Sequence, residues 1–117
     1  MKALVLGPEG PALQQVAVPV PKPDEVLVKV RACGLNRADL GMAAGHRHGA
    51  AGGAGAVLGL EFAGEVTQVG ARVRGLREGD RVMCSGSGAF AEYAVADWGR
   101  TTPIPSAAMS FEQAATL

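Results

Sequence analysis

Residues 25–40 read EVLVKVRACGLNRADL, and this stretch predicts a strand that passes through a tight turn into a short helix. Alternate positions of residues 25–32 form two faces, with Val26, Val28, Val30 and Ala32 on one and Leu27, Lys29 and Arg31 on the other. That period of two is typical of a strand. Asn36 is a favourable helix N-cap, and Asp39 follows near the positive end of the helix dipole. The stretch therefore places Asn36 where a strand becomes a helix.

Short β-patterned segments, punctuated by Gly and Pro, continue on both sides of this stretch. We expect strands over residues 2–6, 13–18, 58–69, 81–84, 90–95 and 101–104. Pro19, Pro21 and Pro23 predict an extended connector outside the sheet. The fold class is therefore mostly β, an irregular barrel or sandwich with one or two short helices.

Two segments depart from the β pattern. Residues 41–57 contain six Gly and six Ala in 17 positions, which predicts a mobile loop carrying exposed His46 and His48 and a candidate pocket lid. Near the end of the chain, Ser110 and Gln113 have the spacing of a capping box. We therefore expect one domain over residues 1–109 and, over residues 110–117, the start of a helix leading into a second domain.

The bulk composition excludes several classes of partner. The 117 residues suit one domain, and 11 Lys plus Arg balance 11 Asp plus Glu, so no electrostatic reason exists to expect nucleic acid. No apolar run approaches the ~20 residues that span a bilayer, and the apolar N-terminus is too short for a secretory signal. Cys33 and Cys84 are expected as free thiols. We expect a cytoplasmic protein with no nucleic-acid or membrane partner.

Three catalytic or binding motifs can be set aside from spacing. The glycines at 49, 52 and 53 have no strand before them and no clear helix after them, which a phosphate loop requires. No Ser-His-Asp arrangement or nucleophile elbow is present. The possible metal ligands lack the paired close spacing of a zinc site and are expected to be solvated histidines, small buried thiols and lone carboxylates: Cys33, Cys84, His46, His48, Glu61 and Glu92.

Four segments remain, at residues 33–40 (CGLNRADL), 58–66 (LGLEFAGEV), 78–82 (EGDRV) and 90–93 (FAEY). Each alone suits a cap, a turn or a strand. In this order, together with MSFEQAATL at residues 109–117, they resemble the N-terminal GroES-like domain of the medium-chain dehydrogenase/reductase superfamily. Within it they look like the zinc-free quinone oxidoreductase branch, of the zeta-crystallin-like and p53-inducible types. The resemblance implies a GroES-like irregular β-barrel, with a Rossmann cofactor domain that this chain lacks.

The resemblance also assigns candidate site residues. Zinc-dependent members carry a Cys ligand where this chain has Asn36 and a His ligand where it has Leu60, whereas the following Glu is kept as Glu61. The structural four-cysteine lobe would follow Asp80, and only Cys84 is present there. The expected metal is therefore none. Asn36 and Glu61 are the expected catalytic residues, with Asn36 also expected to contact the cofactor, because its amide can polarise a carbonyl and orient a nicotinamide ribose.

The implied parent protein reduces quinones or activated alkenes such as enones by hydride transfer from NADPH, which it binds mostly through the missing domain. The parent is expected to be a homodimer, and this chain alone is expected to be inactive. Several relatives carry a Tyr where this chain has Gly41, which leaves the pocket wall open. The alternatives are an enoyl reductase or alcohol dehydrogenase of the same superfamily, and a non-enzymatic GroES-like binding module anchored by Met42 and Val57.

Overall fold

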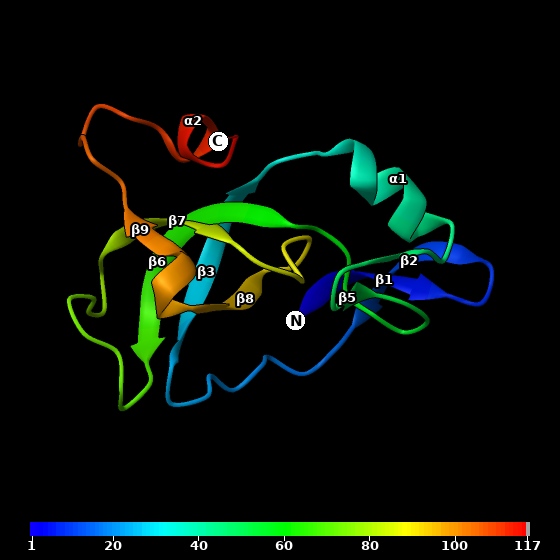
Figure 1. Cartoon of the computed structure of the whole chain (residues 1–117), viewed down its shortest axis with the longest axis horizontal. Helices are drawn as coiled ribbons and strands as arrows, with labels where there is room; N and C mark the ends of the chain where they lie inside the picture. The colour runs from blue at the N-terminus through cyan, green and yellow to red at the C-terminus, as the bar shows by residue number, and fades with distance from the viewer. Residues whose placement is uncertain (117) are drawn as a thin grey trace.

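A computed structural model of the chain describes residues 1–116. Its main feature is a five-stranded antiparallel sheet that curls into half of a barrel (Figure 1). The strands lie in the order β8-β3-β6-β7-β9. Their bounds are β3 Glu25–Cys33, β6 Glu61–Val69, β7 Arg81–Ser85, β8 Tyr93–Asp97 and β9 Thr101–Pro103. The expected mostly β class and the irregular barrel are confirmed.

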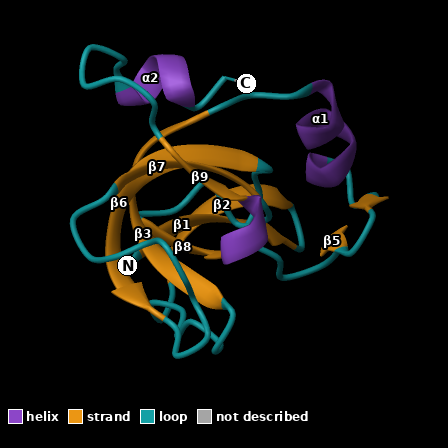
Figure 2. Cartoon of the chain, turned by 60° about the vertical axis from the view of Figure 1, so that its left-hand side comes forward, coloured by secondary structure: helices purple, strands orange, loops and turns teal. Residues whose placement is uncertain are grey.

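Smaller elements lie around this sheet (Figure 2). The hairpin strands β1 and β2 pair with each other, and so do the two-residue strands β4 and β5. The bounds of all the smaller elements are β1 Lys2–Gly7, β2 Gly10–Gln15, α1 Arg37–Ala43, β4 Arg47–His48, β5 Ala51–Gly52, the 3₁₀ turn η1 Trp98–Arg100 and α2 Phe111–Ala114. Both α-helices within residues 1–116 are much too short and polar to cross a membrane.

The core follows the period-two pattern of the sequence. Val26 and Val28 of β3 are fully buried against Phe62 and Val66 of β6 and Val82 of β7. A β-bulge shifts the β3–β6 register between Val30 and Ala32, and such a bulge bends the strand and increases its twist. The predicted alternation of β3 is confirmed along the strand, with Leu27 buried as well.

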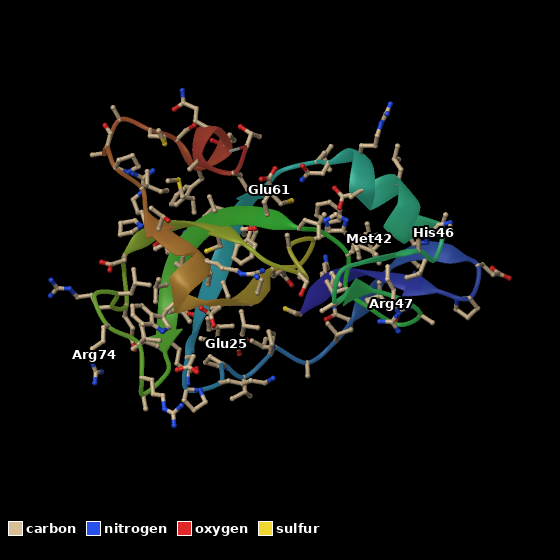
Figure 3. All side chains as sticks on the ribbon, in the orientation of Figure 1. Glu25, Met42, His46, Arg47, Glu61 and Arg74 are labelled. Carbon is tan, nitrogen blue, oxygen red and sulfur yellow. The ribbon has the colours of Figure 1, made fainter. Side chains whose placement is uncertain are left out.

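The expectation of one mobile loop over residues 41–57 is wrong. Helix α1 continues to Ala43, and the short β4–β5 hairpin orders residues 47–52. Met42 is only 1% exposed and packs with Leu6 and Leu58 in a second core cluster (Figure 3). The composition misled because a single large apolar side chain is enough to anchor a segment of small residues. His46 and His48 are exposed, as expected.

Several strand boundaries also differ from the expected ones. The second strand is Gly10–Gln15 rather than residues 13–18, since its pairing partner β1 begins at Lys2 and sets the register. Residues 90–92 bridge to β1 instead of belonging to β8, and the long ladder of β6 begins only at Glu61 rather than at residue 58. The extended connector through the three prolines is confirmed, because no strand is formed between Gln15 and Glu25.

The capping box at the C-terminal end is confirmed within the described residues. The Gln113 N–H donates to Ser110 Oγ at 3.1 Å, and the Ser110 N–H donates to Gln113 Oε1 at 2.9 Å. Buried Ala114 and Ala115 then pack on Ala63 of β6. The last residue of the expected helical segment 110–117, Leu117, lies outside the described residues.

Candidate functional site

Asn36 lies where β3 has ended and α1 begins, as the sequence predicted. Its backbone is extended, with φ −127° and ψ 152°, which is typical of an N-cap residue. The Asn36 N–H donates to Asp39 Oδ2 at 2.7 Å, and the Asp39 N–H donates back to the Asn36 carbonyl oxygen at 2.9 Å. The start of the helix is thus fixed through the backbone of Asn36, and its side chain reaches away toward β6.

The structure brings the two predicted site residues into direct contact. Asn36 Nδ2 donates to Glu61 Oε1 at 3.2 Å, although the residues are 25 positions apart. The pairing of β3 with β6 produces this contact, because Cys33 faces Phe62 and the Gly34 N–H donates to the Glu61 carbonyl oxygen at 3.1 Å. Figure 3 shows Glu61 between α2 and the segment that leads from β3 into α1.

The chemistry of this pair follows from its donors and acceptors. An ionised carboxylate only accepts hydrogen bonds, so Glu61 draws the NH₂ end of the Asn36 amide toward itself. The second N–H of that amide remains for another partner. Asn36 is exposed and Glu61 is half-buried. The arrangement therefore presents an oriented donor and an oriented acceptor at the surface of the domain.

Gly34 is part of this site, although sequence reasoning did not identify it. A methyl group at Gly34 would collide with the Glu61 carboxylate and would lie 2.5 Å from the Ala115 carbonyl oxygen. The backbone just after β3, the Glu61 carboxylate and the end of α2 therefore meet at a position where only a hydrogen atom fits. A glycine isolated between a predicted strand and a predicted helix was the available signal of such a close approach.

A cavity borders Leu60 but does not include the Asn36–Glu61 pair in its lining. Its volume is about 630 Å³, and its floor includes Leu60, whose carbonyl oxygen accepts from the Gly86 N–H at 2.9 Å. Small residues of the 48–51 turn and of residues 85–87 form much of its wall, with His48 and Arg100 as basic groups and Glu25 and Asp97 as acidic groups. Neither Asn36 nor Glu61 lines it. Successive residues of an extended segment point to opposite sides, so Leu60 faces the cavity while Glu61 faces Asn36.

The remaining candidate residues do not join the site as a cluster. Cys33 and Cys84 are free thiols, as expected, but Cys33 is exposed rather than buried. Although the residue is exposed, partial desolvation of its thiol first, and then the charge of Asp39, raises the pKa of Cys33, so the thiolate is disfavoured there. The glycines at 49, 52 and 53 lie in and after the β4–β5 hairpin, not between a strand and a helix. Among residues 1–116, no three His, Cys, Asp or Glu side chains gather in a way that could hold a metal ion.

Comparison with known proteins defines the class of this domain. Residues 22–106 match the family described as the alcohol dehydrogenase GroES-like domain, and the chain belongs to that family. This confirms the resemblance to the medium-chain dehydrogenase/reductase superfamily.

Particular relatives carry the quinone oxidoreductase name. The chain is 39% identical to a quinone oxidoreductase of Sus scrofa over 95% of its own length and 34% of that protein. It is 42% identical to the spectinabilin polyketide synthase system protein NorB of Streptomyces orinoci over 97% of the chain and 5% of that protein. The chain thus spans about a third of the length of the quinone oxidoreductase it matches.

Solved structures have the same fold. The human synaptic vesicle membrane protein VAT-1 homolog-like protein matches with a TM-score of 0.88 and 35% identity, over 98% of this chain and 38% of that one. The quinone oxidoreductase of Escherichia coli, solved in complex with NADPH, matches with a TM-score of 0.86 and 29% identity, over 98% of this chain and 36% of that one.

Proposed function

We propose that this chain is the substrate-side domain of a zinc-free, NADPH-dependent oxidoreductase that reduces quinones or the β-carbon of activated alkenes. Residues 1–109 form the substrate-side domain, and residues 110–117 begin the connection to a Rossmann domain outside this chain. The parent protein is a cytoplasmic homodimer. The relatives named quinone oxidoreductase support this proposal, together with the contact between Asn36 and Glu61.

The hydrogen bond between Asn36 and Glu61 is the observation that carries the proposal. Asn36 is the catalytic residue: its second N–H donates to the substrate carbonyl oxygen, and its amide orients the nicotinamide ribose. An oriented donor stabilises the negative charge that develops on that oxygen. Glu61 acts through Asn36, because its carboxylate holds the amide in one rotamer and one orientation.

The residues of this chain fit only one end of the cofactor. NADPH supplies the hydride when it is bound. The exposed Asn36 amide suits a ribose hydroxyl, whereas the glycines at 49, 52 and 53 lie in a hairpin and its following turn rather than in a strand-to-helix loop. The pyrophosphate is therefore held outside residues 1–116. The amide of Asn36 and the alkyl side chain of Leu60 are not zinc ligands, which supports chemistry by hydrogen bonding rather than by a zinc ion.

Two measurements test the proposal. The isolated chain is titrated with NADPH while nicotinamide fluorescence is followed, and we expect negligible binding. Micromolar binding would contradict the proposal that NADPH binds mostly to a separate Rossmann domain. In the parent protein, Asn36→Ala should lower kcat for quinone reduction by about 10²-fold, the effect of losing one such donor. Glu61→Gln should lower kcat less, because an amide at residue 61 still accepts from Asn36. Gln68→Ala, a change at an exposed residue of β6, is the matched control.

An enoyl reductase is the second candidate, and a specific similarity favours it. Besides the polyketide synthase protein above, the chain is 39% identical to a trans-enoyl reductase of Aspergillus clavatus over 86% of its length. Assay of the parent on quinones against enoyl thioesters separates the two activities. The binding-module alternative loses support, because its expected anchor Met42 is buried in the second core cluster.

A further inference from the structure

The outer edge of β2 is an unpaired strand edge. Within residues 1–116, strand β2 pairs only with β1, and the β1 residues opposite Leu13 and Gln15 direct their backbone groups away from β2. The Leu4 N–H donates to the Phe90 carbonyl oxygen, and the Leu4 carbonyl oxygen accepts from the Leu58 N–H. Leu4 and Leu13 are therefore a non-hydrogen-bonded pair, so the N–H and C=O groups of Leu13 and Gln15 point outward. Within residues 1–116 they have no backbone partner.

The side chains along this edge suit burial. Residues 10–21, GPALQQVAVPVP, contain no charged residue. Leu13, in the middle of β2, is 74% exposed although it is large and apolar. Natural sheets usually protect such an edge with charged side chains or by covering it, and this edge has only Pro11. An uncharged, exposed strand edge is a surface for adding another strand.

The register of this edge is complementary to itself. We propose that β2 pairs antiparallel with β2 of a second copy of this chain, about a two-fold axis at Leu13. In that register the two Leu13 residues exchange both backbone hydrogen bonds. Pro11, which lacks an N–H, lies opposite Gln15, and its carbonyl oxygen accepts from the Gln15 N–H. The N–H that Pro11 lacks is therefore missing only at the two ends of the paired region. The two-fold axis makes each backbone hydrogen bond occur twice, once in each direction.

A second copy is the occupant that the charges favour. Two neutral edges meet without repulsion, whereas a basic or acidic partner finds no opposite charge on residues 10–21. The side chain of Leu13 lies beside Leu4, which packs on the second core cluster, so pairing extends that cluster across the two-fold axis. The β1–β2 hairpin lies at one end of the longest axis of the molecule, away from α2, so two copies can approach end to end (Figure 1). The pairing does not depend on the proposed oxidoreductase activity.

Sedimentation velocity of the 117-residue chain over a concentration series tests the pairing. We expect a monomer–dimer equilibrium with a Kd of about 1 mM or lower. Leu13→Lys places two like charges opposite each other at the axis, and Gln15→Pro removes the outward N–H without touching a bond to β1. Each should raise the Kd at least about tenfold. Circular dichroism verifies that both variants are folded.

Leu40→Lys is the matched control, because Leu40 is also 74% exposed but lies on α1. It should dimerise like the unchanged chain. A chain that remains monomeric at several millimolar overturns the proposal. So does a dimer that Leu40→Lys dissociates and Leu13→Lys leaves intact, since the interface would then lie on α1.

Discussion

Replacing Gly34 with Ala tests the packing that joins the candidate site to the end of the chain. The new Cβ would lie 2.5 Å from the Ala115 carbonyl oxygen and 2.7 Å from Glu61 Cδ, closer than real Cβ contacts. The carboxylate of Glu61 can rotate, but the carbonyl of Ala115 belongs to the backbone and moves only with the end of α2. Overpacking of this kind costs about 1–3 kcal/mol of unfolding free energy.

Thermal unfolding followed by circular dichroism measures this cost. For a domain of this size we expect Gly34→Ala to lower Tm by roughly 4–15 °C. Gly86→Ala is the matched control, because its Cβ would find nothing nearer than 4.0 Å and its backbone has no positive φ. That control should lie within about 0.5 kcal/mol of the unchanged chain.

A second measurement separates the site from general stability. In ¹⁵N NMR of the folded Gly34→Ala variant, the Asn36 side-chain amide should shift, because Glu61 must leave its place to admit the methyl group. If Gly34→Ala melts with Gly86→Ala and the Asn36 amide is unmoved, the close contact among Gly34, Glu61 and Ala115 is not as the structure has it.

Three further predictions concern the rest of the fold. Burial raises the pKa of the Cys84 thiol from 9.0 to about 11, so the folded state holds that proton more tightly than the unfolded chain. The folded state is therefore favoured by about 2–3 kcal/mol below pH 9, and this contribution is lost as the pH rises toward 11. In urea unfolding, the free energy of unfolding should fall over this pH range, and it should fall less in Cys84→Ala. Arg81 donates to the Met109 carbonyl oxygen at 2.7 Å and lies 4.5 Å from the centroid of the Phe111 ring, so it holds the C-terminal segment against the sheet. Arg81→Gln should therefore speed proteolysis within residues 104–116 about fivefold. An unchanged rate would show that Arg81 does not anchor this segment. Phe62→Ala empties the centre of a fully buried site and should cost about 3–5 kcal/mol in urea unfolding; a loss below about 1 kcal/mol would show that Phe62 is not central to the core.

The sequence by itself determined the features that depend on neighbouring residues. The period-two pattern of residues 25–32 predicted the face that β3 buries, because side chains alternate along any strand. The N-cap at Asn36 and the capping box at Ser110 were also readable, since each forms within one turn of chain. The order of short motifs was enough to indicate the family.

Only the tertiary structure decided what distant segments do to one another. The glycine- and alanine-rich stretch became an ordered helix end and hairpin because Met42 meets Leu6 and Leu58, which are far away in sequence. The hydrogen bond from Asn36 to Glu61 depends on the register of β3 against β6 and on a bulge that no local pattern announces. Gly34 matters because the end of α2 returns to it after 80 residues. Local sequence chemistry specifies elements and caps, whereas contacts among elements depend on how the whole chain packs.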